Sequence, residues 1–242
     1  MASIMQATSL PATQETRPII NNKNKNDKTK KEAYAKLGNY IQNNEFLFNI
    51  DNEPTIQEFE TIIGEDLIHI AECVLNTPDN FPKKFKKNGD PCKKQREYLT
   101  DDPDYKGKKI DYIGVCSEWQ EDANDWLYIL SYNGRVVKIG MTVTSLKERY
   151  ESYSCGTTRA MDKGSCSTTN FIISECNYTA KNKGMDVKIY GIPCPPTLIE
   201  KTRFGVTKTC RSSTVRDEET MLTKRFKDVY GHIPMLCVQT GS

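Results

Sequence analysis

The chain has 242 residues, of which 37% are hydrophobic and 27% charged, and its formal net charge is +2. This length accommodates one sizeable domain, or one domain with a smaller companion. No stretch approaches the roughly eighteen apolar residues of a membrane span, and the N-terminus lacks the apolar core of a secretory signal peptide. We therefore expect an intracellular protein.

The cysteines and histidines of the sequence favour neither a disulfide framework nor a zinc site. Nine cysteines are spaced irregularly, without a C-x-x-C pair, and the two histidines, His69 and His232, add no zinc-ligand spacing. We expect reduced cysteines, most of them small buried apolar residues, as is usual inside cells.

Charge is distributed unevenly along the chain. Residues 126–242 hold 17 Lys and Arg against 10 Asp and Glu, a net charge of +7, whereas residues 1–125 hold 17 against 22, a net charge of −5. The basic half would attract a polyanion, for which nucleic acid is the commonest candidate. A lysine-rich surface that serves only solubility is the alternative.

The first half of the chain predicts helices and loops. Residues 1–30 are rich in Ser, Thr, Asn and Lys and lack apolar periodicity, which predicts a flexible tail. A short helix is expected over 31–42. A second is expected from "DNEPTIQEF" to "ECVLN", with Asn52 as cap and an apolar stripe at helical spacing: Ile56, Phe59, Ile63, Leu67, Ile70 and Val74.

Two further features complete this predicted helical N-terminal region, 31–120. His69 lies beside the apolar stripe and is interpreted as a packed or surface histidine rather than a ligand. The basic run 83–96 contains Gly-Asp-Pro and is interpreted as a loop with a solvated face, with phosphate contact as the alternative.

The second half of the chain, 121–242, predicts a succession of strand, turn, strand and helix. Asn133-Gly134 separates two β-branched runs, "DWLYIL" and "RVVKIG", which is the signal of a type I′ hairpin. The elements expected after the hairpin are a helix at "TSLKERYESY", strands at "TNFIIS" and "MDVKIYGIP", a polar connection over 193–212, and a helix over 214–230 ended by Gly231. Before the hairpin, an acidic connector over 101–125 contains one expected short strand at "DYIGVC".

Two ionisable residues fall on apolar helix faces. Glu219 shares the face of the last helix that is defined by Val215, Leu222, Phe226 and Val229, whereas Glu218 points away. A carboxylate buried there needs a cation, a hydrogen-bond network or a cleft. Reaching solvent from the edge of the stripe is the simpler alternative.

The helix predicted at "TSLKERYESY" also carries an ionisable residue on its apolar face, in this case a cation. Arg149 falls on one face with Leu146, Tyr150 and Tyr153. A structural pair between Arg149 and Glu219 would satisfy both groups without any chemistry.

Tyr128 and Lys138 occupy the two strands of the predicted hairpin. A turn at Asn133-Gly134 places Tyr128 opposite residue 139, so strict alternation puts Tyr128 and Lys138 on opposite faces. A bulge would bring them together.

The ordered set of these residues resembles the GIY-YIG nuclease superfamily. Tyr128 lies in "LYI", "KIG" ends the next strand, Arg149 follows in a helix, and Glu219 lies in a later helix. In "KIG" a lysine replaces the second motif tyrosine, a variant of one branch of type II restriction endonucleases. The segments "VVKIGMTVTSLKERYESYSCG", "GSCSTTNF" and "CVQTGS" are similar to that branch in the same order, over roughly 126–242, although Met141 stands where the branch has a histidine.

The resemblance implies a fold, an activity and a set of residues. It implies an α+β GIY-YIG domain over 121–242, with a small antiparallel sheet flanked by helices. It also implies a homodimer that cuts double-stranded DNA at a short palindrome of the TCNGA type, with one Mg²⁺ per active site and a cognate DNA methyltransferase in the host. Lys138 or Tyr128 would act as general base, and Glu219 as the metal ligand. The implied catalytic residues are Tyr128, Lys138, Arg149, Tyr153 and Glu219.

Contacts to DNA are expected from the polar connection 193–212. Arg203, Lys208 and Arg211 are the candidates, for phosphates or for bases. Two other functions stay open: a homing or repair nuclease of the same superfamily, and a catalytically silent DNA-binding module on the same fold.

Overall fold

The structure is a computed structural model that describes residues 41, 43, 48–76, 108–157, 160–161 and 164–237. The predicted tail 1–30, most of the predicted helix 31–42 and the basic run 83–96 lie outside the described residues. No helix in the described part is long and apolar enough to cross a membrane.

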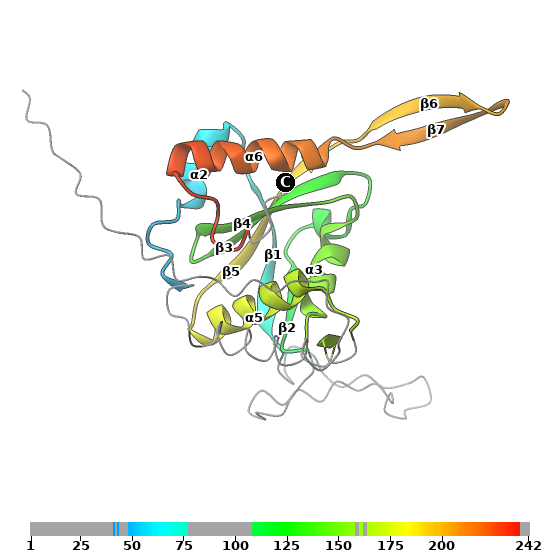
Figure 1. Cartoon of the computed structure of the whole chain (residues 1–242). Helices are drawn as coiled ribbons and strands as arrows, with labels where there is room; N and C mark the ends of the chain where they lie inside the picture. The colour runs from blue at the N-terminus through cyan, green and yellow to red at the C-terminus, as the bar shows by residue number, and fades with distance from the viewer. Residues whose placement is uncertain are drawn as a thin grey trace, which may run out of the picture.

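A five-stranded antiparallel sheet forms the centre of the molecule, in the order β2-β1-β5-β3-β4 (Figure 1). The predicted small antiparallel sheet flanked by helices is confirmed. The predicted domain boundary after residue 120 falls within this sheet, since two of its strands precede that position. The strands are β1 (Ile68–Leu75), β2 (Ile110–Gly114), β3 (Asp125–Tyr132), β4 (Arg135–Thr142) and β5 (Val187–Cys194).

Helices cover both faces of the sheet, and each face has its own apolar cluster (Figure 1). α3 (Leu146–Ser154) and α5 (Thr168–Asn182) pack on the face that carries Tyr128 and Leu130. The opposite face, with Ile129 and Ile139, packs against α2 (Ile56–Ile63) and α6 (Val215–Tyr230). A short 3-10 helix, η2 (Ser117–Gln120), precedes β3.

The predicted hairpin and its helix are confirmed. Asn133 and Gly134 have φ angles of 46° and 75°, the paired positive values that a type I′ turn requires. Ser145 caps α3 by accepting a hydrogen bond from the Glu148 backbone N–H at 3.3 Å. The turn and the cap together place α3 directly after β4.

The long second helix predicted from the first half is wrong beyond residue 63. Thr55, rather than Asn52, caps α2 through a capping box with Glu58. Gly64 then ends the helix in the left-handed conformation, with φ of 74°. Residues 68–75 form β1, in which Ile70 and Val74, four residues apart, share a face of a strand just as they would share a face of a helix.

Three further predictions differ from the structure. The segment "TNFIIS" lies in α5, because Ser167 caps a helix there and Phe171 and Ile173 are buried against the sheet. The connection 193–212 contains a hairpin of β6 (Thr197–Arg203) and β7 (Val206–Ser212). Val229 of α6 is 42% exposed and does not belong to the buried face.

The described cysteines are all free. Only half of these eight are buried, fewer than expected, and Cys155 is exposed.

Candidate active site

A β-bulge decides how Tyr128 and Lys138 lie relative to each other. The register shifts between Leu130 and Ser131, so that Val137 is the extra residue of β4. Tyr128 therefore pairs with Gly140, and Leu130 pairs with Lys138. Directly paired residues share a face and side chains alternate along a strand. The bulge thus brings Tyr128 and Lys138 to the same face.

Arg149 of α3 joins two tyrosines into one hydrogen-bond network. Its Nε–H donates to the Tyr128 hydroxyl at 3.3 Å, and its Nη2–H donates to the Tyr153 hydroxyl at 2.9 Å. The two hydroxyls lie 2.5 Å apart and share a hydrogen bond. Tyr128 and Tyr153 are 1% and 0% exposed, whereas Arg149 is only partly buried. The phenols therefore form a buried platform that orients a guanidinium at the surface.

The surroundings of Arg149 and Tyr153 determine the charge states of the two side chains. Burial lowers the pKa of Arg149, but the neighbouring Tyr128 and Tyr153 outweigh burial and raise it above its usual value. Burial raises the pKa of Tyr153 well above 10, an effect that Tyr128 strengthens and Arg149 opposes. Arg149 is therefore a cation and Tyr153 a neutral phenol near neutral pH. Three of the five guanidinium N–H groups have no partner among the described residues, which leaves one edge of the fork for a ligand.

Tyr150 and Gly140 support this platform, and neither was predicted as a site residue. Tyr150 is fully buried and packs edge to face against Tyr128 and Tyr153, with ring centroids 5.3 and 5.4 Å apart. A Cβ at position 140 would overlap the phenol of Tyr128. The glycine of "KIG" is thus required by the close approach of Tyr128, a signal that the sequence carries only once the pairing is known.

Glu219 and Lys138 approach each other from α6 and β4. Burial raises the pKa of Glu219 above its usual value, while Lys138, Arg149 and Arg216 lower it. Their influence shows that three cations lie near this half-buried carboxylate. Within the described ranges, neither Glu219 nor Lys138 uses its charged group in a hydrogen bond or ion pair. Neither charge is taken up by another described residue, and Lys138 is 8% exposed. The electrostatic links of Glu219 to Lys138 and Arg149 place the predicted catalytic residues in one neighbourhood.

β4 is the last strand of the sheet, and the C-terminal segment covers its edge. The Leu236 N–H donates to the Val137 carbonyl at 2.8 Å, at the bulge. The Ile139 N–H donates to the Cys237 thiol at 3.4 Å. This segment holds the backbone on both sides of Lys138. Met141, where the resembling branch has a histidine, is half-buried on the opposite face.

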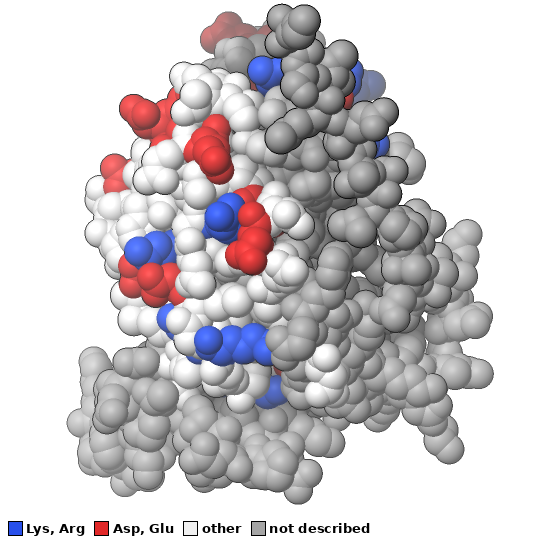
Figure 2. Space-filling model, turned by 90° about the vertical axis from the view of Figure 1, so that its left-hand side faces the viewer, with Lys and Arg blue, Asp and Glu red and all other residues white. Residues whose placement is uncertain are grey.

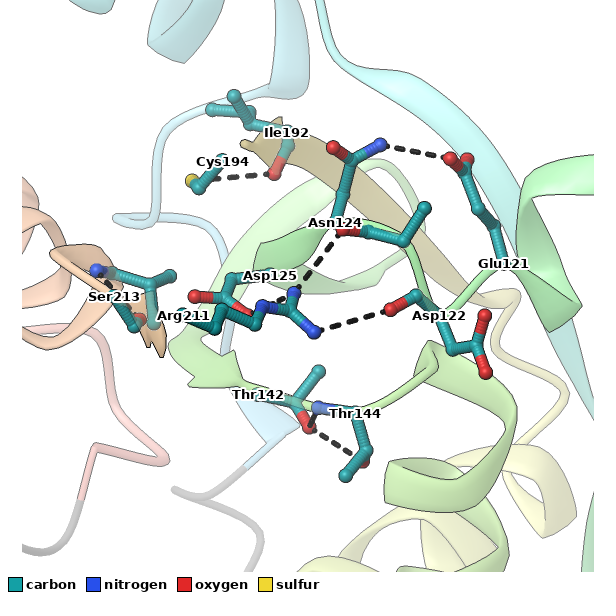
Figure 3. A network of polar contacts seen from close by, with 12 residues as sticks. Glu121, Asp122, Asn124, Asp125, Thr142, Thr144, Ile192, Cys194, Arg211 and Ser213 are labelled. Atoms are coloured by element: carbon teal, nitrogen blue, oxygen red, sulfur yellow. Dashed lines mark hydrogen bonds and ion pairs between the residues drawn. The ribbon is translucent and has the colours of Figure 1, made fainter. Parts of the chain in front are cut away.

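The three predicted DNA-binding residues have different surroundings. Arg203 and Lys208 are exposed on the β6–β7 hairpin. Arg211 instead pairs with the buried carboxylate of Asp125 at 2.6 Å and donates to the carbonyls of Asp122 and Ala123 at 3.3 Å (Figure 3). The guanidinium of Arg211 is thus engaged at the base of the hairpin.

A divalent cation fits this site only with help from a substrate. No group of three or more His, Cys, Asp or Glu side chains among the described residues could hold a metal ion. Glu219 offers one hard oxygen ligand without a competing hydrogen bond, and its neighbours are cations. Mg²⁺ commonly binds one or two carboxylates together with substrate phosphates, so the donor set suits a site that DNA completes.

The described residues form an α+β protein with tyrosine, arginine, lysine and glutamate gathered at one edge of an antiparallel sheet. No family model and no curated protein matches the chain.

Among solved structures, the chain is similar to the restriction endonuclease HPY188I in complex with product DNA, at 19% identity and a TM-score of 0.44, over 80% of this chain and 91% of that one. It is also similar to a mutant of EndoII from bacteriophage T4, at 18% identity and a TM-score of 0.38, over 72% of this chain and 95% of that one. Likeness at this level implies nothing about the chemistry of this chain.

Gly140→Ala is expected to displace Tyr128 and disturb the platform. The added methyl group overlaps the phenol, so we expect a loss of about 1–3 kcal/mol in the free energy of unfolding. We also expect any catalytic activity of this site to fall by on the order of 100-fold, because Arg149 loses its orientation. Denaturant unfolding and single-turnover assays measure the two effects. The control is Ile139→Val, a substitution on the opposite face of the sheet. It should lower the free energy of unfolding and leave the rate unchanged. A wild-type rate in Gly140→Ala would contradict the role of Tyr128.

Proposed function

We propose that the chain is a Mg²⁺-dependent, sequence-specific double-strand DNA endonuclease of the GIY-YIG superfamily, in its type II restriction branch. The observation that supports this proposal most is a convergence. Residues far apart in the sequence, predicted from apolar helix faces and from the motif order, meet at one site: Arg149 bonds Tyr128 and Tyr153, and Lys138 and Arg149 both act on the pKa of Glu219. A structural Arg–Glu pair is disfavoured, because Glu219 forms no ion pair within the described residues.

Each residue has a distinct task in phosphodiester hydrolysis. Arg149 binds the scissile phosphate through the free edge of its guanidinium and stabilises charge that develops on phosphorus. Tyr128 and Tyr153 hold that guanidinium in place. Glu219 and a phosphate oxygen would hold the Mg²⁺ ion. When bound, this ion supplies Lewis-acid stabilisation of the leaving 3′ oxygen.

Lys138 is the better candidate for general base. The Tyr128 hydroxyl is buried and already bonded to Arg149 and Tyr153. The Lys138 amine has no such partner in the described part of the chain, and neutral amine is the form that accepts a proton from water.

The proposal extends to the assembly and to the cell. A palindromic site is matched by a two-fold homodimer, since protein symmetry then mirrors the symmetry of DNA. An intracellular enzyme of this kind requires a methyltransferase that protects the same site in the host genome.

The test of the proposed function is digestion of a long unmethylated duplex by the purified full-length protein with Mg²⁺, followed by sequencing of every fragment end. Ends that share one short palindrome would support a restriction enzyme. Cutting only at long sites or at branched junctions would instead indicate a homing or repair nuclease. Duplex binding without any cleavage would overturn the nuclease proposal and leave a silent binding module.

The pH dependence of cleavage should respond to Arg216. Glu219 must be ionised to bind a cation, so the rate rises with pH through the pKa of Glu219. Arg216 lowers that pKa, and Arg216→Gln should therefore move the acidic limb of the pH–rate profile to higher pH, whereas Arg216→Lys should keep it in place. Arg225→Gln, which removes another exposed arginine of α6, is the control. An acidic limb that stays unchanged in Arg216→Gln would show that Glu219 does not control the rate.

A further inference from the structure

The β6–β7 hairpin, hereafter the arm, projects from the body of the molecule (Figure 1). Its strands pair with each other and with no other strand. None of its residues in β6 or β7 is buried, so neither face of the arm contributes to the core. Seven residues per strand give it a reach of about 20 Å.

The base of the arm is held to the body by a defined network. Arg211, near the end of β7, pairs with Asp125 at the start of β3 and donates to two carbonyls just before it (Figure 3). Asp125 is 1% exposed, so this contact anchors the strand deeply. An element that is anchored at its base and otherwise projects from the body is suited to contact a partner.

One face of the arm is basic. Lys201 and Lys208 pair directly across the two strands, and Arg203 lies two residues further along the same face. Like charges in directly opposite positions destabilise a sheet. The only carboxylate of the two strands, Glu200, belongs to the other face. The arrangement gains stability when an anion binds both lysines.

The tip of the arm is aromatic and conformationally strained. Phe204 is 89% exposed, and its φ of 56° lies in the left-handed region, where a bulky side chain is unfavourable. Arg203 stacks on its ring, with Cζ 4.8 Å from the centroid. Val206, 66% exposed, pairs with Arg203 and extends the apolar surface. An exposed ring held beside a cation is suited to a partner with aromatic and anionic groups.

The opposite side of the molecule differs from the arm. Figure 2 shows the side that faces away from it, and on the described part of that side acidic and basic side chains are interspersed. The basic face of the arm therefore differs from this side of the molecule, and its charge is complementary to a polyanion.

We propose that the arm binds duplex DNA, with Lys201, Lys208 and Arg203 on backbone phosphates and Phe204 inserted from the minor groove between stacked bases. The proposal rests on the proposed function for its choice of polyanion. Apolar side chains are used as wedges of this kind, and they unstack a base step and kink the duplex.

The phosphate contacts are tested by the salt dependence of binding, with full-length Glu219→Gln protein and a mixed-sequence 30-bp duplex without divalent metal. Each neutralised phosphate contributes about 0.9 to the slope of log affinity against log salt. Lys201→Gln/Lys208→Gln should lower the slope by about 1.8. Thermal unfolding should be unchanged or higher, because the repulsive pair is removed. The matched control is Lys183→Gln, which removes an exposed lysine that follows α5. This variant should have the same slope as the protein with Lys183.

The wedge is tested on closed circular DNA that topoisomerase relaxes in the presence of the same protein. Unstacking at any position changes the linking number, so the recognition sequence need not be known. We expect a shift that Phe204→Ala abolishes and Phe204→Leu largely keeps.

Three results would overturn the proposal, and they differ from failure of the proposed function. An unchanged salt slope in the double-lysine variant, with binding intact, would show that DNA does not contact the arm. A linking-number shift that persists in Phe204→Ala would remove the wedge. Sedimentation showing that Phe204→Ala dissociates a dimer would assign the arm to contacts between chains. Failure of the proposed function would appear instead as a wild-type protein that binds the duplex without cutting it, while the salt slope and the linking-number shift still report on the arm.

Discussion

Glu219→Gln is expected to abolish DNA cleavage while leaving the fold and duplex binding intact. Glutamine keeps the shape of the side chain but loses the negative charge and the hard ligand that Mg²⁺ prefers. Loss of Lewis-acid stabilisation worth about 4 kcal/mol corresponds to a rate lower by on the order of 1000-fold. Single-turnover cleavage measured at excess protein isolates this step.

The free energy of unfolding of Glu219→Gln should not fall together with its cleavage rate. Burial raises the pKa of Glu219, so the ionised form is less favourable in the fold than in the unfolded chain. A neutral glutamine should therefore leave the free energy of unfolding unchanged or higher at neutral pH. The adjacent Glu218, which accepts a hydrogen bond from Thr214 at 2.6 Å, provides the control in Glu218→Gln. Equal loss of rate in both variants would contradict a specific role for Glu219.

Arg149→Lys should be nearly as damaging although it conserves charge. A lysine has no planar fork, so it cannot bond both phenols and a phosphate at once. We expect the rate to fall by about 100- to 1000-fold, the range found when a preorganised donor is removed. The measurement is single-turnover cleavage at saturating protein, which separates rate from affinity. The control is Arg225→Lys, the same exchange on α6 outside the site, which should leave the rate unchanged.

The link between Arg149 and Tyr153 can be measured with a double-mutant cycle. Tyr153→Phe removes only the hydroxyl that accepts from Nη2 at 2.9 Å. If Tyr153 acts by holding Arg149, its loss should cost little more once Arg149 is already lysine. Strictly additive losses would contradict the platform and would indicate separate roles.

Local signals in the sequence predicted the hairpin and the helix after it correctly. Features that depend on residues distant in the sequence were not predicted. Asn133-Gly134 specifies its turn through backbone preference alone. Residues 68–75 were predicted as helix, because apolar side chains four apart, here Ile70 and Val74, share a face in a helix and in a strand alike. The run in "TNFIIS" favours a strand locally, but its capping serine and its burial against the sheet select α5.

The candidate site could be predicted in part. Glu219 and Arg149 stood out as charges on apolar stripes, and the motif order added Tyr128, Lys138 and Tyr153. The bulge at Val137 could not be seen, since two consecutive valines fit either register. The support from Tyr150 and Cys237 depends on contacts between distant segments, which no local pattern records. Arg211 was predicted for DNA, but Asp125, 86 residues earlier, engages it.

The measurement that tests the central claim most directly is cleavage by the wild-type protein with Mg²⁺ in ¹⁸O-labelled water, followed by mass spectrometry of the new termini. Water activated at Lys138 attacks phosphorus, its oxygen stays on the phosphate, and the bond to the 3′ oxygen breaks. We predict a 3′-hydroxyl and a 5′-phosphate that carries one ¹⁸O per cut. Unlabelled ends, 3′-phosphates or DNA attached to Tyr128 would contradict the proposed site.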